Sequence, residues 1–503
     1  MSMNNIITKK SNNVAVHFLE KHLKNFPNNI AYIYKEDYVT FKQVYENVNK
    51  MAALLKDLGI RKKNKVCIFI PDSMDFIYTF WGSIWIGSVP IPINILCTEK
   101  DINNILNDSQ ADLIITSKEY VNKIPSSTTK VFIVDDEESL TNKLSKIRGS
   151  ISPEPCNEKD IAFCLYTSGS TSEPKGVIHK HESMIISATS YAEKTIELNK
   201  RDIIYSAVQM PFAYGLGNSL YMPLFVGATS IISSSSNVFD IISEVNKYKP
   251  TVFFGIPSIY SHILSVNHIQ KFCPSNIRLF LSAGEQLPKV IWDEWFRTFN
   301  AEIYEGIGST EMLHIYICNK KGACKPGSSG RPIYGYVATL YDDNGDKVKQ
   351  EEVGELYIQG DSMMKEYSNY SIEYEEGKGY RTGDKYSIDS DGFYHYIGRS
   401  DNTFKINGKW IMPSEIENCI LSHTDISDVV VCPERDKGTG TITIKCYYCT
   451  YENIIDTKKL EREIKVLIRS KLSSDKVPKH LQKVNKIPRN QNGKVNRKLL
   501  DEY

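Results

Sequence analysis

Apolar residues follow helical and strand-like spacings in turn through the first 150 residues. Val14–Phe26 and Thr40–Leu58 carry apolar residues every three or four positions, which predicts two helices. Short apolar runs predict four buried strands: Lys65–Ile70, Ser88–Ile93, Ala111–Thr116 and Lys130–Val134. Strands that alternate with helices in this way are typical of an α/β domain with a parallel sheet.

One uncharged run, Phe76–Leu96, is long enough to span a membrane as a helix. Two glycines and two prolines interrupt the run, and only Phe76–Ile86 keeps a helical pattern. We therefore expect a buried helix, followed by the strand that begins at Ser88, and no membrane segment. Met1–Asn13 is polar and lacks the apolar core of a signal peptide.

Beyond residue 150 the alternation continues, and small residues follow the predicted strands. His181–Leu198 predicts a helix, and apolar runs predict four strands: Ile203–Ala207, Ala228–Ile232, Thr251–Phe254 and Ile277–Leu281. The last strand leads into Ser282-Ala-Gly-Glu285. Parallel sheets bind ligands at the carboxyl ends of their strands, so this segment is a candidate binding position.

The last third of the chain has a different pattern. Residues 326–398 are rich in Gly, Tyr and Asp and alternate as strands do, as in Gly354–Gln359, which predicts a β-rich subdomain. After Gly398–Asp401 the composition becomes Lys-rich and α+β, with two strands and a helix expected: Asp428–Val431, Ile442–Tyr448 and Leu460–Leu472. A chain of 503 residues is too long for one core. We predict a large N-terminal domain of packed, mostly parallel α/β sheets plus the β-rich subdomain, and a small α+β C-terminal domain.

Composition narrows the class of protein without adding a site. The 61 basic and 60 acidic residues nearly balance, which gives no reason to expect a nucleic acid or an acidic membrane as partner. Eleven cysteines are scattered, apart from Cys446-x-x-Cys449, which has no second pair or flanking histidine. This spacing argues against a zinc site and, less strongly, against a redox pair, and we expect a reducing cytoplasm.

The segment Tyr166–Gly176 combines hydroxyl groups, glycines and a lysine between two apolar runs. Its polar groups and glycines are Thr167, Ser168, Gly169, Ser170, Thr171, Ser172, Lys175 and Gly176. Hydroxyl and inward-turned N–H donors with one positive charge suit a polyphosphate. Unlike in a P-loop, Lys175 precedes its glycine. A solvated Ser/Gly linker is the alternative.

Two segments that follow predicted strands carry further candidate chemistry. Pro211–Asn218 reads as an exposed loop with Tyr214 among small residues, or as a tight turn that buries one aromatic ring. Tyr304–Glu311 sets the Thr310 hydroxyl beside the Glu311 carboxylate, a pair suited to a hydrated Mg²⁺ that faces a phosphate. The alternative for this second segment is a glycine turn before a capped helix.

Two weaker segments lie nearer the C-terminus. In Tyr380–Asp384, the Asp384 carboxylate on a turn can accept hydrogen bonds from both hydroxyls of a ribose. Pro488–Val495 presents Lys494 behind a glycine, and the alternative is one more solvated lysine in a basic tail.

Taken together and in order, these segments resemble the motifs of adenylate-forming enzymes, a superfamily of acyl-CoA synthetases, peptide-synthetase adenylation domains and luciferases. The segments are Tyr166–Val177, Tyr304–Glu311, Tyr380–Asp384, Gly398–Gly408 and Asn492–Val495. Three others are similar to benzoate–CoA and hydroxybenzoate–CoA ligases in particular: Pro211–Asn218, Ser282–Glu285 and Gly306–Ile315. Enzymes that activate dihydroxybenzoate carry an asparagine where this chain has Phe212–Tyr214, which argues against catechol acids.

The resemblance implies two half-reactions. An aryl carboxylate, benzoate or a hydroxybenzoate, attacks the α-phosphate of ATP to give an acyl-adenylate and pyrophosphate, with Mg²⁺ as cofactor. The thiol of CoA then attacks the adenylate to give a thioester and AMP. Because the carboxylate needs no base, catalysis rests on positioning and on neutralising phosphate charge.

The resemblance also assigns nucleotide-binding roles. The β- and γ-phosphates would lie against Thr167, Ser168, Gly169, Ser170, Thr171 and Lys175. Adenine would lie between Ser282, Ala283, Gly284 and Glu285 on one side and Glu305, Gly306 and Ile307 on the other. Single side chains take the remaining roles: Thr310 at the α-phosphate, Glu311 at Mg²⁺, Asp384 at the ribose with Arg399 nearby, and Lys494 bridging the acid and the α-phosphate.

The acyl group and the thiol would use other residues. The implied acyl pocket, in which glycine and alanine leave room for a flat ring, consists of Ala213, Tyr214, Gly215, Gly308, His314 and Ile315. His314 would bond a ring hydroxyl or orient the carboxylate, or is a buried structural histidine. The resemblance implies domains 1–398 and 402–503, a hinge at 399–401 centred on Asp401, and a thiol tunnel lined by Lys405 and Gly408. Rotation about the hinge would exchange Lys494 for the tunnel loop between half-reactions.

Alternative functions remain at this stage. The aryl-adenylate could pass to the phosphopantetheine of a separate acyl carrier protein instead of CoA. An NTP-binding regulator or ATPase is a different class, against which the order Lys175-Gly176 and the presence of Lys494 argue. The oligomeric state stays open, with a homodimer as one option.

Overall fold

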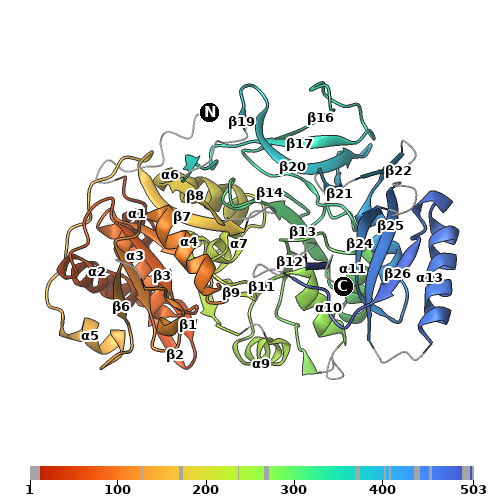
Figure 1. The fold of residues 1–503 in the computed structure, drawn as a ribbon. Helices are drawn as coiled ribbons and strands as arrows, with labels where there is room; N and C mark the ends of the chain where they lie inside the picture. Colours follow the sequence, from red (N-terminus) through yellow and green to blue (C-terminus); the bar gives the residue numbers. More distant parts are fainter. Residues whose placement is uncertain are drawn as a thin grey trace.

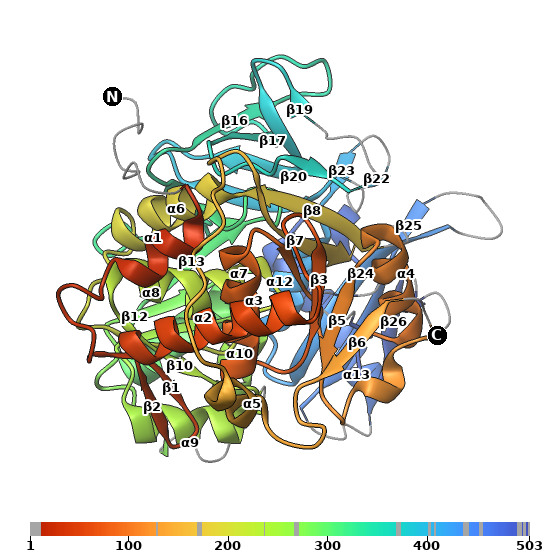
Figure 2. The same ribbon diagram turned by 90° about the vertical axis from the view of Figure 1, so that its left-hand side faces the viewer.

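The computed structural model describes most of the chain, and its parts follow the sequence in space. The described residues are 12–126, 129–168, 174–235, 237–265, 271–368, 374–400, 404–406, 409–435, 442–451, 456–489, 495 and 499–500. In Figure 1 the N-terminal segments lie at the left, the β-rich segment at the top and the C-terminal segment at the right. Figure 2 shows the N-terminal helices in front of these layers.

The first alternating stretch forms a four-stranded parallel sheet, as predicted. Its strands, in the order β4-β3-β5-β6, are Val89–Pro92, Lys65–Phe69, Leu113–Thr116 and Lys130–Ile133. The helices of this part are α1 (Val14–Glu20), α2 (Phe41–Asp57), α3 (Met74–Trp85), α4 (Glu99–Ser109) and α5 (Leu140–Lys146). Thr40 caps α2 with Gln43 in a reciprocal capping box. The predicted first helix is wrong in length, because α1 ends at Glu20 rather than Phe26.

A nine-stranded sheet forms the centre of the large domain. Its strands run in the order β15-β14-β13-β12-β11-β9-β10-β1-β2. The six central strands are parallel: β13 (Ile303–Gly308), β12 (Leu279–Ser282), β11 (Val252–Gly255), β9 (Ile203–Ser206), β10 (Thr229–Ile232) and β1 (Ile30–Tyr34). Antiparallel strands close its ends: β14 (Ile315–Cys318), β15 (Arg331–Pro332) and β2 (Asp37–Thr40). Crossover helices α9 (Val238–Tyr248), α10 (Pro257–Ser265) and α11 (Lys289–Phe299) connect the parallel strands.

Both ends of the segment Tyr166–Gly176, predicted as a loop, are paired strand. β7 (Ile161–Ser168) and β8 (Pro174–Lys180) form an antiparallel hairpin, in which Tyr166 pairs with Gly176 and Thr167 with Lys175. β18 (Glu366–Tyr367) adds to the other edge of β8. The loop prediction is therefore wrong at 166–168 and 174–176, because cross-strand pairing continues through polar residues that carry no strand pattern, and residues 169–173 lie outside the described ones.

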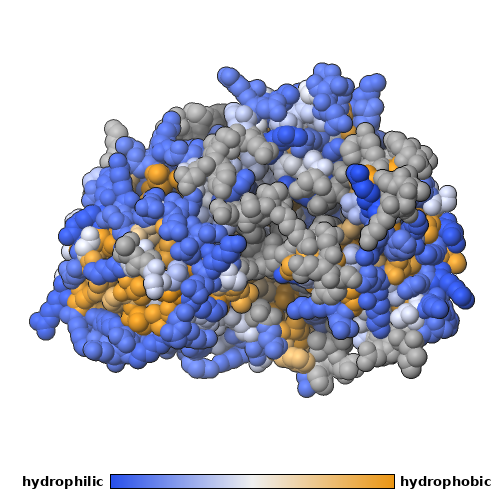
Figure 3. All heavy atoms as spheres, in the orientation of Figure 1, coloured by the Kyte–Doolittle hydropathy of each residue, from blue (hydrophilic) through white to orange (hydrophobic). Residues whose placement is uncertain are grey.

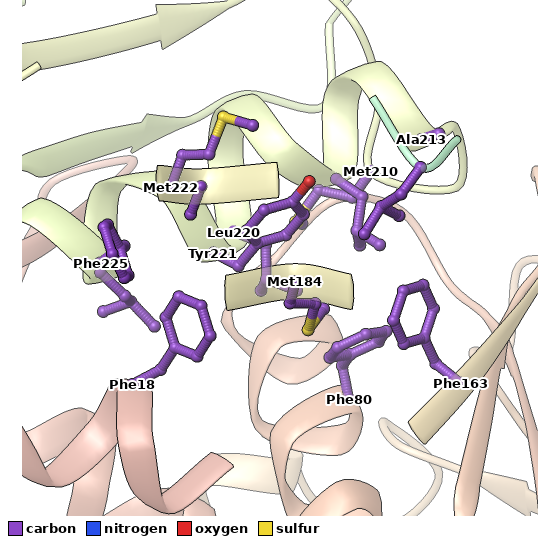
Figure 4. Packing of buried hydrophobic residues seen from close by; sticks show 14 of the residues in the cluster. Phe18, Phe80, Phe163, Met184, Met210, Ala213, Leu220, Tyr221, Met222 and Phe225 are labelled. Atoms are coloured by element: carbon purple, nitrogen blue, oxygen red, sulfur yellow. The ribbon is translucent and has the colours of Figure 1, made fainter. Parts of the chain in front are cut away.

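The segment Pro211–Asn218, predicted as an exposed loop, is helical and largely buried. It contains α7 (Ala213–Leu216) and the start of the π-helix η3 (Gly217–Tyr221), followed by α8 (Met222–Val226). The predicted helix His181–Leu198 is also divided, into α6 (His181–Ser187) and the π-helix η2 (Ala188–Glu193). Figure 4 shows Tyr221 and Met184 at the centre of the apolar cluster between these helices and the N-terminal helices.

The β-rich subdomain and the C-terminal domain are both present as predicted. A five-stranded antiparallel sheet contains β16 (Val337–Tyr341), β17 (Gly354–Gln359), β20 (Gly379–Ile388), β19 (Tyr374–Glu375) and β21 (Tyr394–Arg399). The C-terminal domain has its own hydrophobic core, formed by a short hairpin, a three-stranded sheet and two helices. These are β22 (Phe404–Ile406), β23 (Lys409–Ile411), β24 (Ile426–Arg435), β25 (Ile442–Thr450), β26 (His480–Lys483), α12 (Pro413–Leu421) and α13 (Thr457–Lys471).

Surface and cysteine properties agree with the composition. Hydrophilic residues cover much of the face in Figure 3, with an apolar area in the part of the view where Figure 1 shows β3 and β6. Among the described residues, no helix is long and apolar enough to cross a membrane. All eleven cysteines are free thiols, and the described part of the chain holds no group of three or more metal-ligating side chains.

Candidate active site

Three adjacent parallel strands end side by side, and two of them, β12 and β13, lead into segments that the sequence singles out. β11 ends at Gly255, β12 at Ser282 and β13 at Gly308. Beyond β12, Gly284 has a φ of +90°, a left-handed conformation that favours glycine. Because sheets of this kind bind ligands at the carboxyl ends of their strands, this edge is the candidate active site.

A lysine, a tyrosine and a glutamate from three segments meet beside this edge. The Tyr367 hydroxyl of β18 donates a hydrogen bond to Glu311 Oε1 at 2.8 Å. The Lys175 ammonium of β8 lies 5.8 Å from the centroid of the Tyr367 ring. His179 Nε2 lies 2.8 Å from the Thr310 carbonyl oxygen. The structure therefore brings together Lys175, Thr310 and Glu311, the described members of the predicted catalytic set.

His179 fixes the position of the residue before Glu311. Burial lowers the pKa of His179 to about 3, so the ring is neutral. A carbonyl oxygen only accepts hydrogen bonds, so Nε2 carries the proton that is donated to Thr310. This bond ties the turn after β13 to strand β8 of the β7–β8 hairpin.

Asp108 of α4 links strand β7 of that hairpin to the residue that follows β18. The Tyr166 hydroxyl and the Ser368 hydroxyl each donate to Asp108 Oδ2 at 2.5 Å. A Cβ at Gly176 would lie 2.8 Å from Ser368 Oγ and 3.0 Å from Tyr166 Cζ. Position 176 therefore needs glycine for close packing beneath the hairpin.

Asp384 and Arg399 lie on neighbouring strands. They pair across β20 and β21, and Arg399 Nη1 lies 3.4 Å from Asp384 Oδ1. The same nitrogen donates to the Thr382 carbonyl at 2.8 Å. Burial, followed by the charges of Asp384 and Glu311, raises the pKa of Tyr316 well above its usual value. The predicted ribose carboxylate and the predicted Mg²⁺ carboxylate thus lie near one buried tyrosine.

The predicted adenine-side residues differ in their surroundings. Glu305 is buried, and its Oε1 accepts a hydrogen bond from the Ser329 hydroxyl at 3.3 Å. Burial raises the pKa of Glu305 to about 8, so the carboxyl is largely protonated at neutral pH. Ser282 and Ala283 are buried, whereas Ile307 is half-buried. Among these side chains, Glu305 already accepts a hydrogen bond from another protein side chain, Ser329.

Glu285 connects the large domain to the C-terminal domain. Its Oε1 lies 3.2 Å from Arg489 Nη1, and each of the two side chains is about one-third exposed. Arg489 also forms an ion pair with Asp428 of β24 at 2.9 Å. Arg489 bridges to Val495 in the backbone, so this ion pair lies at the base of the segment that contains Lys494.

Tyr214 and His314 form the centre of the predicted acyl pocket. His314 Nε2 lies 3.3 Å from the Tyr214 carbonyl oxygen, and the two ring centroids are 5.4 Å apart. The His314 ring also lies 4.9 Å from that of Tyr191. Burial lowers the pKa of His314 to about 3, so the neutral ring donates from Nε2 and keeps a lone pair on Nδ1. Ala213 and Ile315 are buried beside this group.

The two glycines predicted to leave room for a ring have a different reason. A Cβ at Gly215 would lie 2.0 Å from the Gln209 carbonyl oxygen. A Cβ at Gly308 would lie 2.4 Å from the His314 carbonyl oxygen. The backbones approach too closely for any side chain, so close packing rather than substrate space explains both glycines.

Several predicted residues lie outside the described part of the chain. They are Gly169, Ser170, Thr171, Asp401, Gly408 and Lys494, and the side chains of Ser168 and Lys405. Sequence reasoning missed Asp108, His179, Tyr367 and Arg489. No local pattern marks them, because each acts through a partner distant in the sequence.

Comparison with known families assigns the class of protein. The AMP-binding enzyme family matches residues 19–368, and the AMP-binding enzyme C-terminal domain matches residues 415–494. The chain belongs to the AMP-binding enzyme family. The resemblance to adenylate-forming enzymes is thereby confirmed.

Individual relatives include aryl acid ligases. A 4-hydroxybenzoate–CoA/benzoate–CoA ligase of Rhodopseudomonas palustris is 32% identical, over 97% of this chain and 94% of its own. A benzoate–CoA ligase of Thauera aromatica is 32% identical, over 91% of this chain and 89% of its own. The solved structure of a benzoate CoA ligase from Burkholderia xenovorans is 30% identical, with a TM-score of 0.90 over 97% of this chain and 99% of its own. That of the anthranilate CoA ligase AuaEII with anthranoyl-AMP is 28% identical, with a TM-score of 0.92 over 97% of this chain and 96% of its own.

Proposed function

We propose that this protein is an AMP-forming ligase that joins an aryl carboxylic acid, benzoate or a hydroxybenzoate, to CoA. One observation carries the proposal. Lys175 lies near Thr310 and Glu311, and Glu311 stands three residues before His314, which contacts Tyr214. Thr310 and Glu311, to which we assign the phosphate and the Mg²⁺, therefore share the turn after β13 with His314, to which we assign the acyl group. The aryl specificity of the relatives supports the acid, and their CoA specificity supports the thiol.

In the first half-reaction, an oxygen of the acid bonds to the α-phosphorus of ATP, and the bond to the β-phosphate bridge breaks. Pyrophosphate leaves with the electron pair. Lys175 would stabilise charge on the β- and γ-phosphates, and Thr310 would contact the α-phosphate. These groups act by position and charge, and such preorganised electrostatic contacts are commonly the largest contribution to rate.

Glu311 would hold a Mg²⁺ ion. Mg²⁺ prefers one or two carboxylates together with phosphate oxygens and water, and Glu311 offers a single carboxylate oriented by Tyr367. When bound, the ion supplies further neutralisation of the phosphate charge.

In the second half-reaction, the CoA thiol loses its proton to water and its sulfur bonds to the acyl carbon. The bond from that carbon to the phosphate oxygen breaks, and AMP leaves with the electron pair. We extend the proposal to a rotation of the C-terminal domain about Asp401, which would remove Lys494 and bring Lys405 and Gly408 to the thiol. Asp384 and Arg399 would hold the ribose in both steps, with Ser282–Glu285 and Glu305–Ile307 near adenine. Conformational steps of this kind often limit turnover.

The test uses the purified protein with ATP and a panel of acids. We expect benzoate or a hydroxybenzoate to drive ATP–pyrophosphate exchange, and CoA to convert the adenylate to a thioester with AMP as product. Exchange with straight-chain fatty acids alone would refute the aryl acid. Orthophosphate in place of pyrophosphate would indicate an ATPase. A thioester formed only with holo acyl carrier protein would replace CoA as the acceptor.

A further inference from the structure

A buried asparagine lies one helical turn from Tyr214, in the helix that would contact the acyl group. Asn218 belongs to the π-helix η3 and has no exposed surface. Neither its amide oxygen nor its amide nitrogen has a hydrogen-bond partner among the described residues. The great majority of buried polar atoms in proteins are hydrogen-bonded, so an amide with both atoms unpaired points to a missing partner.

The hydroxyl of Tyr214 shares this situation. It is buried, has no hydrogen-bond partner within the described ranges, and lies next to the Asn218 side chain. A small rotation could bond the two groups to each other. Such a bond would satisfy one polar atom of the Asn218 amide and leave the other unpaired, since the amide carries both donors and an acceptor. The pair therefore retains the capacity to bind a further polar group.

The helix that carries this pair also packs against His314. A Cβ at Gly217 would lie 2.5 Å from the His314 ring, so the helix touches His314 between Tyr214 and Asn218. Elsewhere the same segment contributes Leu220 and Tyr221 to the apolar cluster in Figure 4. π-Helical turns are frequent at functional sites, and η3 carries Asn218, whose side chain lies next to Tyr214.

We propose that the Asn218 amide and the Tyr214 hydroxyl bind a hydrogen-bonding substituent on the aromatic ring of the acid, a hydroxyl or an amine. This assignment rests on the proposed aryl acid activation and makes Asn218 a specificity-determining residue. A substituent that both donates and accepts a hydrogen bond matches the unpaired atoms. Unsubstituted benzoate leaves them unpaired, and sites built for a substrate hydroxyl discriminate strongly against analogues that lack it.

The test measures ATP–pyrophosphate exchange with benzoate and with the three hydroxybenzoate and three aminobenzoate isomers. The readout is kcat/KM for each substituted acid divided by kcat/KM for benzoate. In the wild type we expect this ratio to exceed one for at least one isomer. In Asn218→Leu and in Tyr214→Phe we expect the ratio for that isomer to fall roughly 10- to 100-fold.

Asn49→Leu is the matched control. Asn49 is also buried, in α2 outside the proposed site, where its amide nitrogen donates to the Tyr45 carbonyl at 3.0 Å. Loss of stability alone would alter all acids together and leave the ratio constant, as we expect for this control. Should Asn218→Leu fail to fold, Tyr214→Phe, which removes a single oxygen, decides the question. If folded variants exchange with aryl acids but keep the wild-type ratio, the assignment of Asn218 and Tyr214 is overturned and the proposed function stands. No exchange with any aryl acid would overturn both.

Discussion

The Glu285–Arg489 ion pair gives a direct test of how the two domains cooperate. Glu285→Gln keeps the size of the side chain and removes its charge, while Arg489 keeps Asp428 as a partner. The pair joins the end of β12 to the base of the segment that contains Lys494. We therefore expect it to favour the domain arrangement used for adenylation.

The magnitude follows from the geometry. Arg489 Nη1 and Glu285 Oε1 are 3.2 Å apart, but the side chains of Arg489 and Glu285 are 28% and 35% exposed, so solvent screens the pair. Ion pairs of this exposure contribute about 1 kcal/mol or less, which corresponds to a population shift of about fivefold at most. Adenylation should slow by about two- to fivefold, and thioester formation from supplied aryl-adenylate should be unchanged or faster.

The assay measures the two half-reactions separately, by ATP–pyrophosphate exchange and by release of AMP from supplied adenylate and CoA. Asp293→Asn, which removes a surface ion pair with Lys289 in α11, is the matched control and should affect neither. The reversed pair, Glu285→Arg with Arg489→Glu, should recover part of the loss. Equal slowing of both half-reactions by Glu285→Gln would refute the reasoning.

Three further predictions concern single residues. Lys494→Ala should lower ATP–pyrophosphate exchange by roughly 10²–10³ and leave thioester formation from supplied adenylate largely intact; a loss below about tenfold would contradict its role. Asp401→Pro should do the converse by restricting φ at the hinge, and equal effects on both half-reactions would argue against rotation. Asp72, whose carboxylate accepts the Met210 N–H, is buried, and burial raises its pKa to about 7. Above about pH 4 the carboxyl ionises in the unfolded state but not in the folded state, so the folded state loses relative stability up to about pH 7. Asp72→Asn removes this loss. The variant should therefore gain stability over the wild type between pH 5 and 8, by at most about 4 kcal/mol. Urea unfolding of the variant and the wild type at pH 5 and at pH 8 checks this. A difference in unfolding free energy between the two proteins that does not change with pH would contradict it.

Strand positions could be read from the sequence because burial on both faces leaves a continuous apolar run. β3, β5 and β11 lie within a residue or two of their predicted positions for this reason. The α/β class and the β-rich subdomain followed from the same patterns. The helix at Ala213–Leu216 did not, because its glycines suggest a loop by local propensity. The close packing of Gly215 on Gln209 and of Gly217 on His314 favours the helical conformation instead.

The candidate site was predictable where one segment carries its chemistry. Thr310 and Glu311, for example, stand side by side in a motif and lie together in the structure. Tyr367 lies 56 residues from its partner Glu311, and Arg489 lies 204 residues from Glu285. Local spacing contains no information about such pairs. The unpaired atoms of Asn218 likewise become visible only when the surrounding residues are known.

The paired strands of the β7–β8 hairpin have a consequence for the proposed nucleotide binding. Three cross-strand pairs, Tyr166 with Gly176, Thr167 with Lys175 and Ser168 with Pro174, fix six backbone positions of the segment. Asp108 accepts a hydrogen bond from the Tyr166 hydroxyl of the same hairpin. Ordering the backbone of one residue costs roughly 1–2 kcal/mol of conformational entropy. About 6–12 kcal/mol of that cost is therefore met when the protein folds. A triphosphate bound there, as we propose, would not have to supply it and would retain more of its binding free energy as affinity.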